Sequence, residues 1–434
     1  MLKQTLTYFK ENFELAYSCK PVWQEIDLGF NDSCKIQLTK PEFENPLENL
    51  DEIVWKEWNG TNIPFIMNRS NHDSILTIRP NNKITINFDI VTAAWYLMSG
   101  VQELENKNRD QYGRFKYEES IQKRLDIVGI PVVNYYFDIL KDAIEFVTNS
   151  EIKTNRKFSA TITHDIDEVT SGWKHRVRTE LNSKKYLKAI LHGLSQSFTS
   201  FSPWQNLKEL SDFNKDNSVP SSFFLLARNN KVGNIKNADY ELSNPYMQQS
   251  IINFKTNGHE VGIHGSYKTH DSAKELKKDL IKIEEQVNGN RFHFLQYEIQ
   301  NSSKVIEGNK LKFDSTLGFQ EEIGFRNSIC TPFKLYNFKE NRSFNFLEIP
   351  LNIMDCSLEY DNYMGISPKE SLIEIKKLTQ EIKKFNGNIC INWHNTYFSN
   401  YLKSDWKSLY KEVIEYLKKE NCEFVTCSEL VERK

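Results

Sequence analysis

The stretch FSATITHDID (158–167) decides the fold class, because it is a run of apolar and β-branched residues that ends in ionisable ones. This composition is typical of a buried strand. Six later stretches have the same character, with helical patterns between several of them: SVPSSFFLLA (218–227), HEVGIH (259–264), NRFHFLQY (290–297), FNFLEIPLNIMD (344–355), GNICINWH (387–394) and CEFVTC (422–427). Repeated strand–helix units predict an α/β fold with a mainly parallel sheet, either open or closed into a barrel.

Two of the intervening helices carry their own start and stop signals. In SAKELKKDLIKIEEQV (272–287), apolar residues recur at steps of three and four, and Ser272 with Glu275 forms a capping-box pattern. Gly289 is expected to end this helix. The stretch SPKESLIEIKKLTQEIKKFNG (367–387) repeats the arrangement, with a proline in its first turn.

The character of the sequence changes near residue 150. Before it lie short mixed segments, such as KITINFDIV (83–91), which alternates like a strand and continues into an apolar stretch. We therefore expect a small α+β domain of unknown role over residues 1–150 and the strand–helix domain over residues 151–434. The N-terminal part offers no chemical motif, and GRF (113–115) is interpreted as packing and turn residues.

Composition excludes several classes of protein. The 56 Lys and Arg residues nearly balance 58 Asp and Glu, which gives a formal charge of −2 and no argument for a nucleic-acid binder or a polybasic membrane anchor. No apolar run approaches the roughly 20 residues that span a bilayer. The seven cysteines are scattered, and the first residues show no secretory signal. These features predict a cytoplasmic protein with reduced thiols.

Ionisable residues gather where the expected strands end. Five of the nine histidines lie in these segments, namely His164, His264, His270, His293 and His394. Parallel α/β folds place their chemistry at the carboxyl ends of the strands. The set is therefore interpreted as a functional site, although any one of these histidines alone is more often structural.

Side-chain parity places the two carboxylates of the first strand together. Alternate residues of a strand share a face, so Asp165 and Asp167 project the same way while His164 points to the other side. Two close like charges are unfavourable unless a cation lies between them. A divalent metal on one aspartate would leave the other as a base, with His394 as an acid on another strand. These ligand types do not choose between zinc and other first-row metals.

The order of THDID (163–167), EVGIHGSYKTH (260–270) and INWH (391–394) resembles the polysaccharide deacetylase family, carbohydrate esterase family 4. That family has a TFDD-like strand end, then an HxxxH run preceded by Glu-Ile/Val-Gly, then an apolar strand that ends in histidine. The resemblance covers roughly 158–430 and is closest to a divergent bacterial branch with an extra N-terminal domain. It implies a distorted (β/α) barrel, a divalent metal with zinc as first choice, and hydrolysis of an acetyl group on a sugar or polysaccharide.

The resemblance also implies roles for particular residues. Asp165 matches the catalytic base, and Asp167 and His264 match metal ligands. His394 matches the histidine that protonates the leaving group. Arg291 takes the place of the arginine that orients the base.

The second histidine ligand departs from the family pattern, because Lys268 stands four residues after His264. His270 is the preferred replacement and His293 is its rival. Arg326 and Asp355 are candidates for orienting His394 or for binding the substrate, and Trp393 and Tyr267 are candidates for stacking on a sugar. Two alternative functions remain open: a catalytically silent barrel that binds glycans, and a metal-dependent hydrolase of another C–N bond.

Overall fold

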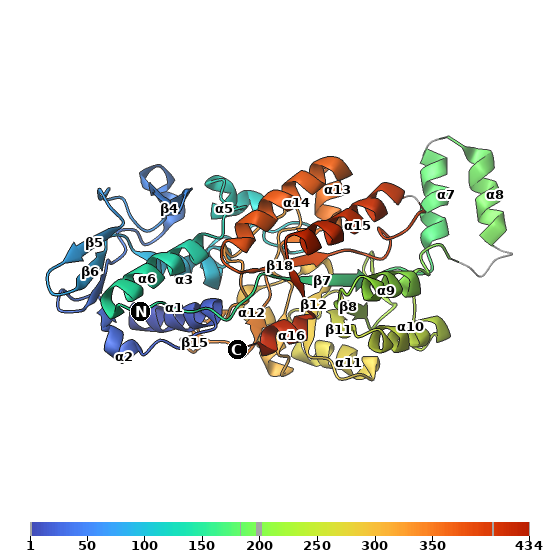
Figure 1. Cartoon of the computed structure of the whole chain (residues 1–434). Helices are drawn as coiled ribbons and strands as arrows, with labels where there is room; N and C mark the ends of the chain where they lie inside the picture. Colours follow the sequence, from blue (N-terminus) through green and yellow to red (C-terminus); the bar gives the residue numbers. More distant parts are fainter. Residues whose placement is uncertain (1, 183, 197–201, 402, 434) are drawn as a thin grey trace.

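The computed structural model describes residues 2–182, 184–196, 202–401 and 403–433. Its centre is a curled sheet of parallel strands in the order β16-β13-β12-β11-β8-β7-β18-β17, and β19 also pairs with β7 (Figure 1). The strands of this sheet are β7 (Ser159–Ile166), β8 (Ser221–Leu226), β11 (Glu260–Gly265), β12 (Gly289–Phe292), β13 (Phe313–Asp314), β16 (Leu347–Glu348), β17 (Ile353–Met354), β18 (Asn388–Asn392) and β19 (Glu423–Phe424). All seven stretches predicted as strands after residue 157 contribute to it.

Helices connect the strands and cover the sheet (Figure 1). They are α7 (Gly172–Asn182), α8 (Tyr186–Gln196), α9 (Leu207–Asp216), α10 (Pro245–Thr256), α11 (Ala273–Ile283), α12 (Ile299–Gly308), α13 (Asp355–Glu359), α14 (Pro368–Lys383), α15 (Ser404–Lys419) and α16 (Cys427–Glu432). Two-stranded ribbons lie in the connections: β9 (Lys231–Val232) with β10 (Ile235–Lys236), and β14 (Tyr336–Asn337) with β15 (Arg342–Ser343). Among the described residues no ladder joins β16 to β17, so the sheet curls without closing. The predicted distorted (β/α) barrel is confirmed.

Strand β7 lies in the middle of the sheet and is buried along its whole length. A strand covered on both faces needs a nearly continuous apolar sequence, which explains why this stretch indicates the fold so strongly. The ladders also fix which residues are neighbours at the carboxyl edge. Thr163 of β7 pairs with Asn392 of β18, and His264 of β11 pairs with Arg291 of β12.

The predicted end of the helix after Ser272 is wrong by several residues. The helix α11 ends at Ile283, where Glu284 takes a left-handed conformation with φ 57°. Gly289 instead opens β12, and a Cβ atom there would lie 2.1 Å from ring carbons of Phe313 on the adjacent strand. The glycine is required by close strand packing rather than by the helix end. The capping box of Ser367 and Glu370 at α14 is confirmed.

The N-terminal part packs against one end of the barrel (Figure 1). It has a sheet in the order β1-β2-β6-β5, a hairpin of β3 and β4, and helices that pack on each other and on the sheet. Its elements are α1 (Leu2–Tyr17), α2 (Trp23–Ile26), β1 (Leu28–Gly29), β2 (Ile36–Leu38), β3 (Val54–Trp58), β4 (Thr61–Phe65), β5 (Leu76–Arg79), β6 (Lys83–Ile86), α3 (Ile90–Ser99), α4 (Val101–Glu105), α5 (Ile121–Arg124) and α6 (Val132–Thr148). One contiguous hydrophobic core includes residues of this part and of the barrel.

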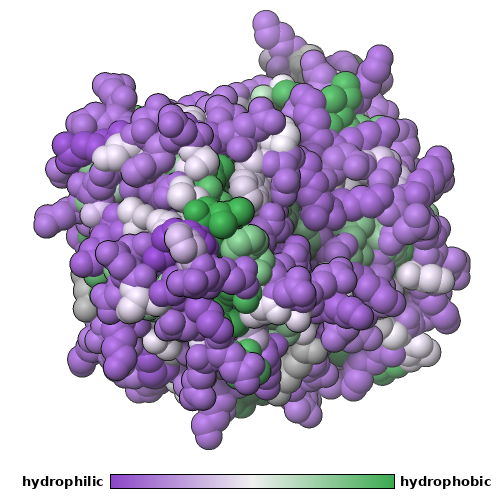
Figure 2. All heavy atoms as spheres, turned by 60° about the vertical axis from the view of Figure 1, so that its left-hand side comes forward, coloured by the Kyte–Doolittle hydropathy of each residue, from purple (hydrophilic) through white to green (hydrophobic). Residues whose placement is uncertain are grey.

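The surface is mostly hydrophilic on the face that Figure 2 shows, and apolar side chains there form only small patches. Within the described part of the chain, no helix is both long and apolar enough to cross a bilayer.

Candidate metal and catalytic site

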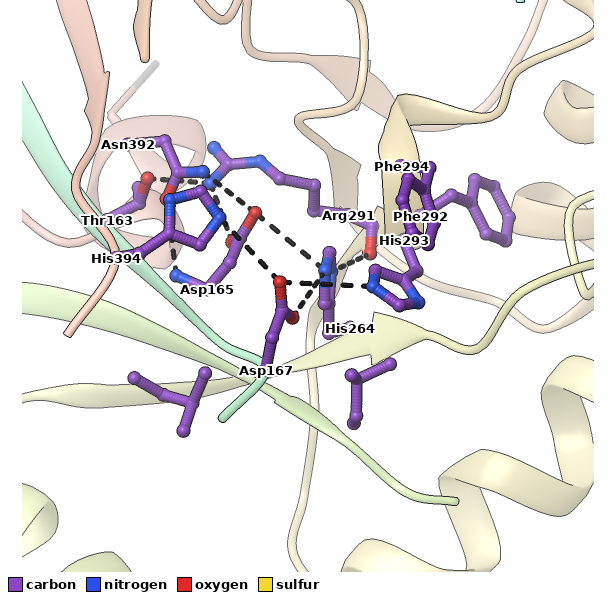
Figure 3. Close-up of polar contacts among 12 residues, drawn as sticks. Thr163, Asp165, Asp167, His264, Arg291, Phe292, His293, Phe294, Asn392 and His394 are labelled. Carbon is purple, nitrogen blue, oxygen red and sulfur yellow. Dashed lines mark hydrogen bonds and ion pairs between the residues drawn. The ribbon is translucent and has the colours of Figure 1, made fainter. Parts of the chain in front are cut away.

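Three potential metal ligands come together at the carboxyl edge of the sheet (Figure 3). Asp167 follows β7, His264 lies near the end of β11, and His293 follows β12. The Nε2 atom of His264 lies 3.4 Å from Asp167 Oδ1, and the Nε2 atom of His293 lies 3.8 Å from Asp167 Oδ2. One ligand atom from each of the three residues lies within 4.8 Å of the other two.

Both imidazoles are oriented by a second contact on the far side of the ring. The Nδ1 atom of His264 lies 2.8 Å from the carbonyl oxygen of Arg291, and that of His293 lies 3.4 Å from Asn237 Oδ1. In a neutral ring that donates from Nδ1 to an oxygen, Nε2 is the unprotonated atom, and in both residues Nε2 faces Asp167, the usual arrangement of ligating histidines. Burial lowers the pKa of His293 to about 4, against the opposing effect of Asp167, so this ring is neutral as a ligand must be.

The three residues fit a divalent cation. The Oδ1 atom of Asp167 is buried and accepts no hydrogen bond from the described residues, which is costly for a carboxylate oxygen without a cation. Two imidazoles and one carboxylate are a donor set that zinc and other first-row metals accept. Three protein ligands leave coordination positions open, as in catalytic rather than structural sites.

Asp165 lies beside this cluster and is held from two sides. Arg291 Nη1 donates to Asp165 Oδ1 over 3.0 Å, and Asn392 Nδ2 donates to Oδ2 over 2.8 Å. Arg291 is itself fixed by Thr163 Oγ1 at 2.7 Å and by the carbonyl of Ser315 at 2.7 Å. Burial raises the pKa of Asp165, but Arg291 and then His264 outweigh it, and the pKa falls below its ordinary value. Asp165 is therefore ionised near neutral pH.

His394 approaches the same pocket from the loop after β18. Its Nδ1 atom lies 2.7 Å from Asp355 Oδ1, and its backbone N–H donates to Asp355 Oδ2 over 2.6 Å. Its Nε2 atom lies 3.8 Å from Asp167 Oδ2. Burial lowers the pKa of His394, but Asp355 and then Cys356 outweigh it and raise the pKa well above its ordinary value. The ring is held as a cation that can give up a proton.

The structure brings His293, and not His270, to the cluster, which corrects the preference stated from the sequence. The loop after β11 folds back on itself, with Thr269 bonded to the carbonyl of Ser266 at 2.9 Å. It buries the ring of His270 edge-on to Phe292. Lys268 takes a left-handed φ of 65° and points to solvent. The second imidazole nitrogen therefore comes from His293, directly after the next strand, so the lysine does not remove a ligand.

Three of the four candidates for substrate contact do not line the pocket. Trp393 is fully buried and packs its ring on Tyr410, so it belongs to the core. Arg326 is buried in an ion pair with Glu103, with N–O distances of 2.7 and 3.0 Å, and does not line the pocket. Tyr267 packs edge-on against a pocket aromatic, Phe294, without lining the pocket itself. The fourth, Asp355, orients His394, the alternative role considered for it.

Residues of the N-terminal part complete the pocket, which has a volume of about 190 Å³. Tyr112 stacks on Phe294 with ring centres 4.8 Å apart, and both line the pocket. Arg114 donates to Gln320 Oε1 over 2.7 Å and to the carbonyl of Phe294 over 3.3 Å. The interpretation of residues 113–115 as plain packing was therefore incomplete. No local pattern could have shown that this loop reaches an edge formed 50 or more residues later.

A second aromatic pair lies on the pocket wall. Tyr360 and Tyr363 stack with ring centres 5.8 Å apart, and both line the pocket.

His164 is a structural histidine: its Nδ1 atom lies 2.7 Å from the carbonyl of Trp393 and its Nε2 atom 2.9 Å from Asn214. This outcome agrees with the parity argument, which placed His164 on the opposite face from the two aspartates.

Comparisons with known proteins found one family model and several solved structures that are similar to parts of this chain. Residues 4–149 match the model of a family of unknown function (DUF7033). A putative polysaccharide deacetylase from Mycobacterium smegmatis is 13% identical, with a TM-score of 0.40, over 64% of this chain and 90% of that one. A probable polysaccharide deacetylase from Pseudomonas aeruginosa is 12% identical, with a TM-score of 0.41, over 63% and 90%. A CE4 family pseudoenzyme from Bacillus anthracis is 10% identical, with a TM-score of 0.33, over 64% and 66%.

No curated protein matches the sequence. The class that the fold defines is an α/β protein with an incomplete (β/α) barrel of parallel strands, preceded by an N-terminal part.

Proposed function

We propose that this protein is a metal-dependent hydrolase that removes an acetyl group from an N-acetylated or O-acetylated sugar or polysaccharide. One observation carries the proposal. Three ligand atoms, from Asp167, His264 and His293, converge in a pocket that also holds an ionised carboxylate, Asp165, and a cationic imidazole, His394. Hydrolysis of an amide or ester can use a metal ion, a general base and a general acid together, and this pocket has residues for all three.

Asp167, His264 and His293 would hold the cation, with zinc as the first choice. A divalent cation in such a site supplies Lewis acidity, which polarises an acyl carbonyl and makes water a stronger acid. The chain supplies the orientation of these ligands through the contacts of their Nδ1 atoms.

Asp165 would accept the proton of the attacking water. Its two oxygens are fixed by Arg291 and Asn392, so the carboxylate cannot rotate away from the pocket. Because Arg291 stabilises the ionised form, the base is present without a prior deprotonation step. Arg291 is a positioning residue, since it touches Asp165 rather than the pocket.

His394 would donate a proton to the departing nitrogen or oxygen. Asp355 contacts Nδ1 of the ring and accepts from the backbone N–H of His394, and it keeps the ring charged, so that Nε2 carries the proton that faces the pocket. Asp165 lies in β7 and His394 in the loop after β18, which places base and acid on separate elements around the cluster.

The pocket walls favour a sugar as the group that carries the acetyl. Tyr112 with Phe294 forms one stacked aromatic pair, and Tyr360 with Tyr363 forms another. Aromatic faces pack on the apolar faces of sugar rings, and Gln320 offers a polar group beside them. This wall supports the proposed partner, an acetylated sugar or polysaccharide.

The first test is release of acetate. We expect zinc-loaded protein to liberate acetate from N-acetylglucosamine oligosaccharides or O-acetylated sugars, and a chelator to lower the rate by roughly 100-fold or more, because the Lewis acid supplies several kcal/mol. Acetate in the medium is measured enzymatically, with zinc added back as the control. Failure to bind any divalent ion would favour the silent glycan-binding barrel. Stoichiometric zinc with hydrolysis of cyclic amides but no acetate would favour the other C–N hydrolase.

Tyr112 gives a test of the N-terminal contribution. Replacing Tyr112 by Ala removes the ring that stacks on Phe294 and should raise KM by roughly 3- to 10-fold with little change in kcat, because stacking is worth about 0.5–1.5 kcal/mol. Tyr112→Phe keeps the ring and should behave like the wild type. An unchanged KM in both variants would show that the N-terminal loop does not contact the substrate.

A further inference from the structure

The helices α7 and α8 form a hairpin that stands away from the body of the protein (Figure 1). It follows β7, extends beyond the carboxyl end of that strand, and its two helices contact each other. The backbone N–H groups of Val169, Thr170 and Ser171 donate to the carboxylate of Asp239 at distances of 2.6–2.8 Å. These hydrogen bonds fix the segment directly before α7.

The apolar face of α8 points to solvent, the reverse of an ordinary amphipathic helix. Its large aliphatic residues recur at steps of three and four, so they form one stripe. Leu187 is 77% exposed, Ile190 58%, Leu191 61% and Leu194 56%. The small residue Ala189 faces inward and is only 2% exposed. A helix that only needed to pack on α7 would turn the aliphatic stripe inward.

This concentration of apolar side chains occurs nowhere else on the described surface. Twelve large hydrophobic residues are exposed among the described residues, and six of them fall within residues 181–194, including Leu181 and Tyr186 beside the stripe. The other six are spread over the rest of the chain. Contiguous apolar patches mark sites of interaction, whereas single exposed residues need no explanation.

The charge of the hairpin indicates the kind of surface that it fits. Residues 172–196 contain six Lys and Arg residues and one carboxylate, although the whole chain has a formal charge of −2. Lys184, Lys185 and Lys188 are exposed beside the start of the stripe. The balanced overall charge, which gave no argument for a polybasic anchor, therefore hides a local basic cluster. Aliphatic residues with Tyr on one side and lysines around them are the pattern of helices that lie in the interface of anionic membranes.

We propose that the α7–α8 hairpin binds the surface of a membrane that contains anionic lipids. The stripe would enter the boundary between headgroups and acyl chains, while the lysines would contact the lipid phosphates. This inference does not depend on the proposed hydrolase activity, because it concerns a surface outside the pocket. It differs from a membrane span, since α8 has only 11 residues.

The test is flotation of the full-length protein with vesicles of phosphatidylcholine alone or mixed with phosphatidylglycerol. We expect the wild type to float only with the anionic vesicles, and less at high salt. The charge variant Lys184→Glu, Lys185→Glu and Lys188→Glu should bind at least 100-fold more weakly, since each cation near an anionic surface contributes about fivefold.

The apolar variant replaces Leu187, Ile190, Leu191 and Leu194 by Ser and should lose flotation. The matched control makes the same change to Ser at Ile252 and Ile281, which are similarly exposed aliphatic residues outside the hairpin. It should float like the wild type. Circular dichroism and thermal unfolding check that every variant is folded. Wild-type protein that floats with neither vesicle, or an apolar variant that still floats, would overturn the proposal. The proposal would also be overturned if the wild type formed a dimer, the apolar variant did not, and neither protein bound vesicles.

Discussion

Asp165→Asn should abolish acetate release while the protein still binds its metal. The amide keeps the size of the side chain but cannot accept the proton of the attacking water, and loss of a general base typically costs about 10²–10⁴-fold in rate. The metal ligands Asp167, His264 and His293 are unchanged, so metal content should stay close to that of the wild type. The rate is measured as acetate released under saturating substrate, and the metal by elemental analysis.

Two controls make this result specific. Asp216→Asn makes the same chemical change at an exposed residue of α9 and should leave the rate unaltered. Thermal unfolding of both variants shows whether the buried amide disturbs the fold. Full activity in Asp165→Asn would exclude it as the base, and loss of metal together with activity would show that it is a ligand instead.

His293→Ala should remove metal, whereas His270→Ala should not. Loss of one of three ligands should weaken zinc binding by more than the 10–100-fold that loss of a supporting contact costs. His270 is the matched control, because it is also a buried histidine, its Nδ1 atom has no hydrogen-bond partner among the described residues, and it lies outside the ligand cluster. Zinc affinity is measured by competition with a chromogenic chelator.

Loss of zinc from His270→Ala but not from His293→Ala would favour Asp167, His264 and His270 as the ligands, the set preferred from the sequence. If His270→Ala lost zinc and His293→Ala kept it, the loop after β11 would have to adopt another conformation when metal binds. Equal zinc affinity in both variants and in the wild type would exclude either histidine as a ligand.

The sequence predicted the parts of the site that depend on local periodicity and on strand ends. Parity along one strand separated Asp165 and Asp167 from His164, and the structure has them on opposite faces. The rule that parallel strands meet at one edge brought His264 and His394 to the same pocket although they are 130 residues apart. The roles of all these residues stay predictions.

The sequence could not predict what depends on loops and on distant partners. The conformation of the loop after β11 decides between His270 and His293, and left-handed residues such as Lys268 have no clear signal in a single sequence. Arg326 was a candidate for substrate contact because it lies at a predicted strand or loop end, and its ion pair with Glu103, in the N-terminal part, could not be known from the sequence. Tyr112 was overlooked for the same reason. The limits of the two domains and the cytoplasmic location stay predictions.

The most direct test of the central claim is a crystal structure of zinc-loaded protein with anomalous data at the zinc edge. We predict one strong peak bounded by Asp167 Oδ, His264 Nε2 and His293 Nε2, with Asp165 and His394 in the same pocket but outside the ligand set. A map without a peak at these three residues, from crystals of protein loaded with zinc, would contradict the account.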